Sequence, residues 1–569
     1  MDQNPTLLSV KHLQTGFHSD RGYFPAIKGI SFSIQRGESL GMVGESGSGK
    51  SLTALSLLRL TDHLPGCVMK AEGILYTPEN REPLDLSTLD RTALRKIRGK
   101  EIGLIFQDPS ASLNPVFTCG DQLVEVLRLH MGLDRSSARD AAMGWLEKVQ
   151  LTDIKRIFSS YPHQLSGGQK QRVCIAIALA AGPRLLIADE PTTSLDVTVQ
   201  KRILELIRGL RAETGMSMLF ISHDLGVVAE MTERILVMQQ GEIVEEGLAG
   251  PLFQHPHHPY TRQLLASRPP LDIRLKRLPV LEGQTAQKLG NEAIEKRQLE
   301  MEALPPLLRV EGLEVRYEQP RSGLLGKRNF LNAVAGVDLH IAPGETLGVV
   351  GESGCGKTSL GKAIIRLVDA YKGKVFLEGQ ELLGLPEAQW RSLRRKAQII
   401  FQDPYQSLNP RMPVGEAILE PMAVHGIGKD RREREEETLR WLARVGMDES
   451  HFFRYPHELS GGQRQRIGIA RALAIRPRLL ICDECVSALD VTVQAQILNL
   501  LLDLQEASGF SMLFISHDWA VVRFISDRVM VMREGKVLES GPSEEIWTAP
   551  GHAYTKELIA AVPNWVTGD

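Results

Sequence analysis

The chain carries the same three motifs twice, in the same order, and this internal repeat limits its architecture more than any single motif does. The first copy reads GESGSGKS, LSGGQ and IADE, and the second reads GESGCGKT, LSGGQ and ICDE. The motifs occupy Gly44–Ser51, Leu165–Gln169 and Ile187–Glu190, and then Gly351–Thr358, Leu459–Gln463 and Ile481–Glu484. A module that recurs in this way predicts two domains of the same fold.

The two copies keep a constant spacing over most of their length. Asp189 and Asp483 are 294 residues apart, and so are His223 and His517, whereas the two motif lysines are 307 apart. The first copy therefore holds about a dozen extra residues after its glycine-rich motif. We predict a first domain at residues 1–270, a polar linker at 271–306 that forms a solvated helix or tether, and a second domain at 307–569.

Composition places the chain among soluble globular proteins. Of its 569 residues, 43% are hydrophobic and 24% are charged. The net charge of −2 supplies no basic field, so no nucleic acid partner is expected. Six cysteines in so long a chain favour a reducing compartment over a disulfide framework. No run reaches the roughly 18–20 apolar residues that span a bilayer, and the start lacks a signal-peptide pattern, so we expect a cytoplasmic chain.

Hydrophobic periodicity predicts alternating strands and helices in both copies. The runs SLGMVG and TLGVVG lead into the glycine-rich motifs, and each motif opens a helix. RLLIADE, RLLICDE and the twice-occurring MLFISHD have the length and composition of buried strands. Such alternation predicts an α/β fold with a parallel sheet. The stretches from 107 to 165 and from 402 to 459 are helical and charged in pattern, which indicates a helical subdomain in each copy.

The two glycine-rich motifs are P-loops, in which backbone N–H groups and a helix N-terminus surround phosphate oxygens. Each lysine would contact the β- and γ-phosphates, and the hydroxyl after it would coordinate Mg²⁺. Two such motifs, each followed by an apolar strand that ends in Asp-Glu, leave little room for a chance glycine turn. The residues expected at nucleotide are Gly44, Gly47, Gly49, Lys50, Ser51 and Leu52, with Gly351, Gly354, Gly356, Lys357, Thr358 and Ser359.

The Asp-Glu pairs supply the remaining chemistry. Asp189 and Asp483 end buried strands, where an aspartate can hold Mg²⁺ in a P-loop NTPase. Glu190 and Glu484 follow directly and are placed to orient or deprotonate an attacking water. Adjacent carboxylates alone could be a solvated strand end, but their recurrence after a P-loop favours the catalytic interpretation.

The chain resembles a tandem ATP-binding-cassette (ABC) ATPase over nearly its whole length, because LSGGQ is the signature motif of that family. The resemblance implies two P-loop cassettes, each with a RecA-like parallel-sheet core, a β subdomain and a helical signature subdomain. In this family two cassettes face head to tail, and each ATP lies between the P-loop of one and the signature of the other. The signature residues expected at nucleotide are Ser166, Gly167, Gly168 and Gln169, with Ser460, Gly461, Gly462 and Gln463.

The resemblance assigns further residues to each ATP site. Gln107 and Gln402 match the family's Q-loop glutamines, which contact Mg²⁺ or water, and His223 and His517 match its switch histidines. The resulting metal set is Ser51, Gln107 and Asp189 in one copy, and Thr358, Gln402 and Asp483 in the other. The adenine of this family stacks on an aromatic after the first strand, where the chain has Phe17 and Tyr317. Tyr23 and Phe330 remain rival candidates, because stacking requires only a flat apolar face.

Blocks around the motifs indicate a branch of the family. QDPSASLNP and QDPYQSLNP begin at the Q-loop glutamines, and HPHHPYTRQLLAS and APGHAYTKELIAAVP close the two copies. These blocks are similar to the ATPases of oligopeptide, dipeptide and nickel importers, and the fused form resembles those of glutathione and microcin-C-type peptide importers. The resemblance implies a peripheral ATPase on the cytoplasmic face of the bacterial inner membrane. Its partners would be two permeases and, indirectly, a solute-binding protein, without direct substrate contact.

The cysteines and the linker bear on alternatives to the leading interpretation. Cys485 stands where the first copy has Pro191, so a modest difference in rate between the sites is conceivable. Cys482 and Cys485 spell C-x-x-C, but they enclose the catalytic Asp-Glu pair, and no metal is expected there. Residues 255–306 contain no cysteine, so the iron–sulfur cluster of some relatives is not expected. The alternative function is a soluble tandem-cassette translation factor, which would carry a longer, strongly basic linker.

Overall fold

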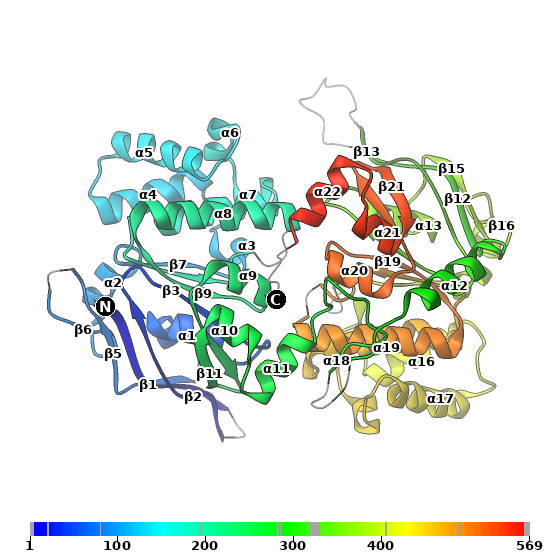
Figure 1. Ribbon diagram of the computed structural model, residues 1–569, viewed down its shortest axis with the longest axis horizontal. Coiled ribbons are helices and arrows are strands. Elements are labelled where there is room, and N and C mark those ends of the chain that lie inside the picture. The colour runs from blue at the N-terminus through cyan, green and yellow to red at the C-terminus, as the bar shows by residue number, and fades with distance from the viewer. Residues whose placement is uncertain are drawn as a thin grey trace. The chain divides into compact units, whose positions relative to one another are not determined.

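The computed structural model of the protein describes residues 5–19, 22–79, 81–192, 196–280, 284, 286–318, 330–403, 407–487 and 489–562. The chain divides into two compact units, the first ending at Leu265 and the second spanning Ala266–Val562. Each unit contains one of the two motif sets and is described by itself (Figure 1).

The core of the first unit is a six-stranded sheet in the order β11-β10-β3-β9-β8-β7. Its strands pair in parallel except β11, which is antiparallel to β10. Every residue of β3, β8 and β9 is buried, as expected for a parallel sheet covered on both faces. The strands are β3 (Ser39–Val43), β7 (Ile102–Ile105), β8 (Leu185–Asp189), β9 (Ser217–Ile221), β10 (Arg234–Gln239) and β11 (Glu242–Leu248).

An antiparallel sheet forms the β subdomain of the first unit. Its strand order is β2-β1-β5-β6, and β4 also pairs with β1. The long pair β1 and β2 shifts register at several points, which lets the two strands bend. The strands are β1 (Thr6–Ser19), β2 (Gly22–Gln35), β4 (Cys67–Lys70), β5 (Gly73–Tyr76) and β6 (Leu84–Asp85).

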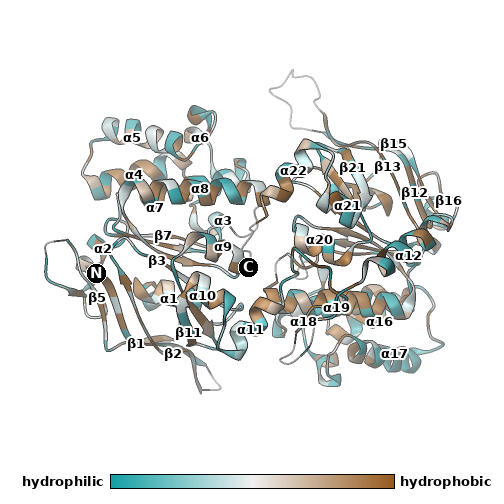
Figure 2. Cartoon of the chain, viewed as in Figure 1, coloured by the Kyte–Doolittle hydropathy of each residue, from teal (hydrophilic) through white to brown (hydrophobic). Residues whose placement is uncertain are grey.

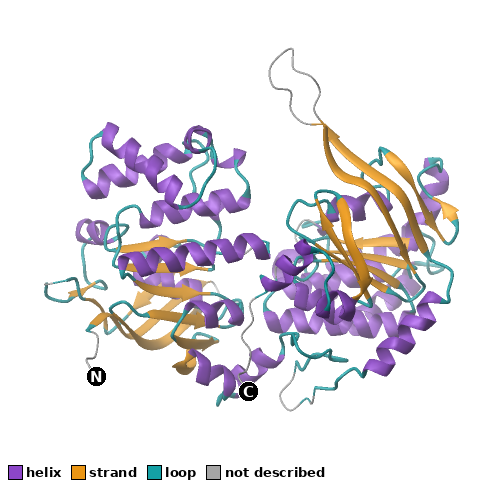
Figure 3. Cartoon of the chain, turned by 45° about the horizontal axis from the view of Figure 1, so that its top comes forward, coloured by secondary structure: helices purple, strands orange, loops and turns teal. Residues whose placement is uncertain are grey.

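Helices cover the core sheet and build the helical subdomain, in which α4 to α7 share a buried apolar cluster. Figure 3 shows the strands gathered into sheets and the helices packed around them. The helices of the first unit are α1 (Lys50–Leu57), α2 (Arg91–Ile97), α3 (Pro109–Ser112), α4 (Cys119–Met131), α5 (Arg135–Lys148), α6 (Ile154–Ser159), α7 (Gly167–Leu179), α8 (Val197–Thr214), α9 (Leu225–Met231), α10 (Ala249–Gln254) and α11 (Pro259–Ala266).

The second unit repeats this architecture. Its core sheet has the order β17-β18-β19-β14-β20-β21, and its antiparallel sheet has the order β13-β12-β15-β16. The predicted α/β fold with a parallel core is therefore confirmed in both copies. The strands are β12 (Leu308–Glu318), β13 (Phe330–Ile341), β14 (Thr346–Val350), β15 (Lys372–Leu377), β16 (Gln380–Glu381), β17 (Ala397–Ile400), β18 (Leu479–Asp483), β19 (Ser511–Ile515), β20 (Arg528–Arg533) and β21 (Lys536–Pro542).

Hydropathy follows the same division in the second unit. Figure 2 shows the charged helix α17 in teal, whereas the core helix α16 carries much brown. The helices are α12 (Asn291–Glu302), α13 (Lys357–Ile364), α14 (Glu387–Leu393), α16 (Val414–Val424), α17 (Arg431–Arg444), α18 (Gly461–Leu473), α19 (Val491–Ser508), α20 (Trp519–Ile525), α21 (Ser543–Thr548) and α22 (Ala553–Ala560). No helix in the described parts of the chain is long and apolar enough to cross a membrane.

The segment expected as a polar tether begins by packing against the second unit. Leu275 and Leu278 are buried in the core of that unit. The backbone of Leu278 exchanges two hydrogen bonds with the Asn499 side chain, at 3.0 and 2.8 Å. Arg277 forms ion pairs with Asp503 and Glu506 at 2.8 and 2.9 Å. Two leucines three residues apart thus bury apolar surface that the overall polarity of the segment concealed.

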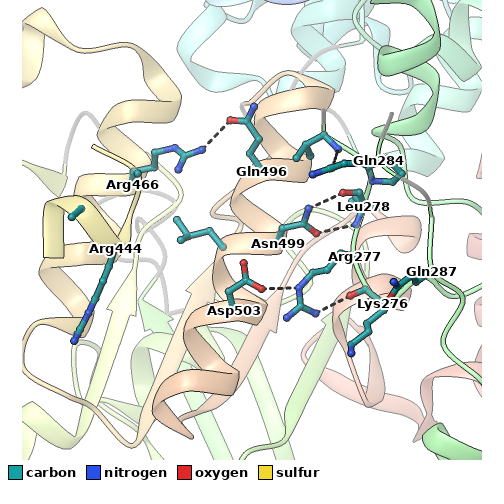
Figure 4. Close-up of a pocket in the computed structure, with 15 residues that line it drawn as sticks. Lys276, Arg277, Leu278, Gln284, Gln287, Arg444, Arg466, Gln496, Asn499 and Asp503 are labelled. Atoms are coloured by element: carbon teal, nitrogen blue, oxygen red, sulfur yellow. Dashed lines mark hydrogen bonds and ion pairs between the residues drawn. The ribbon is translucent and has the colours of Figure 1, made fainter. Parts of the chain in front are cut away.

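The later part of this segment is more exposed but still anchored. Helix α12 has the solvated character that the sequence predicts, and its Arg297 pairs with the buried Asp527 at 2.7 Å. Residues 276–280, 284 and 287 line a cavity of about 610 Å³ together with residues in or next to α17, α18 and α19 (Figure 4). Arg277, Asn499 and Asp503 meet at its wall. The segment is thus a structural part of the second unit.

Candidate functional site: two repeated P-loop centres

Glycines allow the sharp turn of the first P-loop. The loop joins the end of β3 to the first residue of α1. Gly44 has φ of 153°, and a Cβ at this position would lie 2.2 Å from the carbonyl oxygen of Met238. Gly49, directly before the helix, has φ of 103°. A side chain would clash at the first position and be strained at both, so the glycine-rich motif has a steric cause.

The P-loop lysines lie within their own loops. Lys50 donates hydrogen bonds of 2.8 Å to the carbonyl oxygens of Gly44 and Glu45, and it is only 4% exposed. Lys357 makes the two matching bonds in the second unit, at 2.7 and 2.9 Å. Each ammonium is thereby fixed inside the loop whose amides can surround a phosphate group.

The hydroxyl after each lysine meets the aspartate at the end of a core strand. Ser51 Oγ donates to Asp189 Oδ1 at 2.9 Å, and Thr358 Oγ1 donates to Asp483 Oδ1 at 2.8 Å. Burial raises the pKa of Asp189 to about 6, although the hydrogen bond from Ser51 opposes this shift. Burial raises the pKa of Asp483 in the same direction.

This donor set fits a magnesium ion held jointly with nucleotide. A hydroxyl and a carboxylate are the hard oxygen ligands that Mg²⁺ takes, and it usually keeps waters and phosphate oxygens in its other positions. A buried carboxylate with a raised pKa gains a counter-charge when such a cation binds. Among the described residues, no group of three or more His, Cys, Asp or Glu side chains could hold a metal ion.

Two of the predicted residues meet at Glu190, the predicted catalytic glutamate of the first unit. Gln107 Nε2 donates to Glu190 Oε2 at 3.0 Å, and His223 Nδ1 lies 3.2 Å from the same oxygen. Glu190 follows β8, Gln107 lies beyond the end of β7, and His223 follows β9. These are adjacent parallel strands, so their carboxyl ends bring the three side chains together.

The second unit repeats this cluster. Gln402 Nε2 donates to Glu484 Oε2 at 2.8 Å, and His517 Nδ1 lies 3.5 Å from that oxygen. Burial opposes protonation of His517, but the hydrogen bond and charge of Glu484 outweigh it and raise the pKa of the histidine. Burial likewise opposes ionisation of Glu484, and the contact with His517 outweighs it and lowers the pKa of the glutamate. The pair is therefore stabilised as carboxylate and imidazolium.

Both glutamates have an unusual backbone conformation. Glu190 has φ of 45° and Glu484 has φ of 47°, in the left-handed region that residues with a side chain rarely adopt. A conformation of this kind costs about 1–3 kcal/mol and is retained where the surroundings enforce it. Its occurrence at the same position in both copies indicates that the carboxylate must point in one particular direction.

The signature motif caps a helix in each unit. Ser166 precedes α7, its hydroxyl accepts from the Gln169 amide at 3.3 Å, and the Gln169 side chain accepts from the Ser166 amide at 3.1 Å. Ser460 and Gln463 form the same reciprocal cap before α18. The motif is thus built as a rigid helix N-terminus, which suits an anion.

Glycine in the signature motif has a packing reason as well. A Cβ at Gly168 would lie 2.9 Å from Val199, and one at Gly462 would lie 2.4 Å from Val493. The middle of the motif therefore packs closely against the start of α8 or α19. The pairing of each signature with the P-loop of the other unit stays a prediction.

The aromatic candidates for adenine differ in their surroundings. Tyr317 is 39% exposed, and its hydroxyl lies 3.2 Å from Ser359 Oγ, in the helix that begins at the P-loop lysine. Phe17 is partly buried at the end of β1 and pairs across the sheet with Phe24. The contact of Tyr317 favours a position beside the second P-loop, whereas Phe17 stays a prediction.

Some predicted blocks extend beyond the described residues. Positions 404–406 of the second QDP block, 193–195 after the first Asp-Glu pair, 488 after the second, and Pro563 at the end of the last block are not among them. Cys485 is among the described residues and is buried. Its hydrogen bond with Cys482, together with burial, raises the pKa of the Cys482 thiol. Nothing in its surroundings indicates a different chemistry at Glu484.

Sequence reasoning missed one contact with the P-loop. The hydroxyl of Tyr260, in the first turn of α11, accepts a hydrogen bond from the Glu45 amide at 3.0 Å. Tyr554, in α22, accepts one from the Glu352 amide at 3.2 Å. The tyrosine recurs in the blocks HPYT and HAYT, but the repeat alone does not show what the tyrosine contacts.

Comparison with known protein families places both halves of the chain. Residues 27–193 and 334–487 match the family model "ABC transporter". Residues 244–293 and 538–568 match the model "Oligopeptide/dipeptide transporter, C-terminal region". The second match includes the helices that follow each core sheet. Helices α10 and α11, and in the second unit α21 and α22, are referred to below as the C-terminal extension of each unit.

Similar proteins match over almost the whole chain. The glutathione import ATP-binding protein GsiA of Escherichia coli K12 is 47% identical over 566 residues, covering 98% of this chain and 89% of that protein. The GsiA protein of Pectobacterium atrosepticum is 46% identical over 568 residues, with the same coverage. A solved structure of the ATP-binding cassette MJ0796 with ADP and Pi matches at 27% identity and a TM-score of 0.38, covering 42% of this chain and 98% of that one.

The family models and the two GsiA relatives cover both cassettes. They give no support to the translation-factor alternative, because the extension that follows each core is of the oligopeptide and dipeptide transporter type. The chain belongs to the ABC transporter family, as an ATPase built from two cassettes.

Proposed function

We propose that this chain is the energy-coupling ATPase of an importer for glutathione or a closely related small peptide. The observation that carries the proposal is its 46–47% identity, across 98% of its length, to glutathione import ATP-binding proteins. Both units keep a full set of candidate catalytic residues, which supports two hydrolysing sites.

In each unit, ATP would bind with its phosphates against the P-loop amides and the lysine ammonium. Ser51, Gln107 and Asp189 would hold Mg²⁺ in the first unit, and Thr358, Gln402 and Asp483 in the second. The bound cation supplies charge neutralisation for the β- and γ-phosphates. The 2.9 Å contact of Ser51 with Asp189 and the 2.8 Å contact of Thr358 with Asp483 support this placement.

Hydrolysis would depend on the glutamate that follows each aspartate. Glu190 and Glu484 would orient the attacking water and accept its proton as the γ-phosphate bond breaks. The glutamine and histidine already contact one oxygen of this carboxylate, so they can fix its direction. His223 and His517 would also contact the γ-phosphate, which gives them a means to sense whether it is present.

Coupling to transport would require the two units to close on ATP and to reopen after hydrolysis. The signature helices that begin after Ser166 and Ser460 would each cap the ATP bound by the other unit. Two permease subunits would receive the motion through the segments that follow Gln107 and Gln402. The chain would work at the cytoplasmic face of the bacterial inner membrane, and an external binding protein together with the permeases would select the solute.

The proposal can be tested by purifying the tagged chain from detergent-solubilised membranes of its host. The recovered complex is placed in proteoliposomes with ATP inside, and uptake of labelled glutathione is compared with uptake of a labelled dipeptide and of a nickel chelate. The matched control is the same complex with Glu190→Gln and Glu484→Gln, which retains both nucleotide sites and lacks the proposed bases.

We expect two permeases to be recovered, and glutathione to enter only with ATP and an unmodified chain. Uptake of the nickel chelate in place of either peptide would contradict the proposed solute class and leave the importer assignment standing, whereas uptake of the dipeptide alone would replace glutathione with another small peptide. Recovery of the chain without permeases would contradict the proposed coupling role.

A further inference from the structure

A tyrosine of each C-terminal extension reaches into the adjacent P-loop. Tyr260 is 5% exposed and Tyr554 is 2% exposed, so both rings are inside the protein. The two hydroxyls accept from the amides of Glu45 and Glu352 at 3.0 and 3.2 Å. The same contact therefore occurs twice in one chain, between segments about two hundred residues apart in sequence.

The peptide group that receives this contact also holds the catalytic lysine. The carbonyl of Gly44 and the amide of Glu45 belong to one planar peptide unit. The carbonyl accepts from Lys50 at 2.8 Å, and the amide donates to Tyr260 at 3.0 Å. The peptide is held on both sides, so the tyrosine hydroxyl helps to fix the direction of the carbonyl that binds the lysine.

Other contacts fix the tyrosine of the first unit. Glu245, in β11, accepts from the amides of His257 and His258 at 2.8 and 3.1 Å. His258 Nδ1 in turn accepts from the Tyr260 amide at 3.2 Å. A chain of hydrogen bonds thus runs from an edge strand of the core sheet through the start of α11 to the P-loop.

The second unit builds the same chain from matching residues. Glu539, in β21, accepts from the amides of Gly551 and His552 at 2.6 and 3.2 Å and from the Thr555 hydroxyl. His552 Nδ1 accepts from the Tyr554 amide at 3.0 Å. In addition, the guanidinium of Arg533 lies over the Tyr554 ring, 4.6 Å from its centre.

A packing role alone does not account for the hydroxyl groups. Both rings belong to buried apolar clusters, where phenylalanine would fill the same volume. A buried hydroxyl costs free energy unless it finds a partner, and here its partner is the P-loop itself. An amide left without this acceptor would have to turn toward water or another group.

We propose that Tyr260 and Tyr554 are positioning residues that link each C-terminal extension to its ATP site by fixing the first peptide of the P-loop. A fixed loop pays less ordering entropy when it binds phosphate, so the hydroxyl raises affinity for ATP without touching it. Because coupling between binding and conformation is reciprocal, ATP also steadies the start of α11 and α22. The inference rests on ATP binding at the two P-loops and is independent of the proposed solute.

The test removes one oxygen atom from each tyrosine, with Tyr260→Phe and Tyr554→Phe combined. The matched control is Tyr76→Phe, because Tyr76 is also fully buried and its hydroxyl donates to Glu101 at 3.0 Å in the β subdomain. We expect the double variant to raise the KM and the dissociation constant for ATP about two- to tenfold, the effect of a single neutral hydrogen bond, with kcat within about twofold. The control should keep both constants.

Hydrogen exchange of the full chain supplies a second readout. ATP should slow exchange in residues 258–264 and 552–558 of the unmodified protein, and this protection should be lost in the double variant but kept in Tyr76→Phe. An unchanged KM together with a fall in Tm equal to that of the control would show a structural role and overturn the proposal. A fall in kcat at constant KM would overturn it as well, because the residues would then act on the chemical step. None of these measurements involves transport, so the test holds even if the proposed solute is wrong.

Discussion

The two units share their candidate chemistry and differ in what surrounds it. The lysine, hydroxyl–aspartate and glutamine–glutamate contacts of one unit recur in the other within 0.2 Å. In the second unit, residues 271–280 pack against the core, and Arg533 lies over the tyrosine of the extension, at a position where the first unit has Gln239. Divergence has thus affected the supports of the site, whereas the lysine, aspartate, glutamate, glutamine and histidine that would act on ATP are the same in both units.

This contrast separates what hydrolysis requires from what stability allows. Glu190 and Glu484 share even the left-handed backbone conformation, which is costly and would relax if it were not needed. By contrast, Cys485 replaces Pro191 directly beside the catalytic pair and is accommodated as a buried thiol. We therefore expect the two sites to hydrolyse ATP at similar rates, and the two units to differ in the contacts that stabilise them.

The largest expected effect comes from removing the carboxylates. Glu190→Gln and Glu484→Gln together should lower kcat for ATP by about 10²–10⁴-fold, because a positioned general base contributes that much. The two single variants should lose as much activity as each other, and the double variant should accumulate bound ATP. Steady-state phosphate release and a nucleotide-retention assay measure these effects.

Unequal single variants would break the comparison. If Glu484→Gln alone abolished turnover and Glu190→Gln left it unchanged, one site would be catalytic and the other regulatory. Turnover at the normal rate in the double variant would remove both glutamates from the mechanism. Retained ATP binding is the control, since the substitution keeps the shape of each side chain.

The next effect concerns the support that only the second unit has. Leu278→Ala removes a side chain that is 1% exposed and packed in its core, so it should cost about 2–5 kcal/mol of that unit's stability. Scanning calorimetry should show one transition moved to lower temperature and the other unchanged. Leu304→Ala is the matched control, because Leu304 lies in the same segment and is 47% exposed.

A uniform shift of both transitions would mean that the segment supports the two units equally. No shift would mean that residues 271–280 are a tether after all. Arg277→Ala should have a smaller effect than Leu278→Ala, because its two ion pairs are with largely exposed carboxylates, and such pairs contribute little.

Sequence was most informative where chemistry requires particular residues at fixed spacing. The parallel core and the helical subdomain could be anticipated from the sequence pattern, and the resemblance to the family assigned Gln107 and His223 to the same site as Glu190. The structure supplies the reason that these three side chains meet, because they follow adjacent parallel strands. The packing of Leu275 and Leu278 could not be anticipated, since two leucines in a polar segment carry no periodicity. The contact of Tyr260 with the P-loop depends on a distant segment folding back, and a repeated tyrosine alone does not reveal its partner.

The smallest expected effect is a pH dependence of the extension. Burial opposes ionisation of Glu539, but the Thr555 hydroxyl and the amides of Gly551 and His552 outweigh it, and the pKa of this carboxyl lies below its ordinary 4.5. A lowered pKa in the folded state means that the ionised group adds stability above pH 4.5, and that this stability is lost as the pH falls through the lower value. Glu245 in the first unit is shifted in the same direction.

Acid should therefore loosen α11 and α22 before it unfolds the cores. The protection of residues 552–558 against hydrogen exchange, relative to the intrinsic rate at each pH, should fall as the pH drops below 4.5. This fall should be larger in the unmodified chain than in Glu539→Gln, whose amide carries no charge to lose. The variant should already exchange faster at pH 7, and Glu245→Gln should do the same in the first unit only. Equal pH dependence in variant and unmodified chains would show that another group controls the extension. A larger response in the second unit than in the first would contradict the expectation that Arg533 steadies the second, since its contact with Tyr554 does not depend on Glu539.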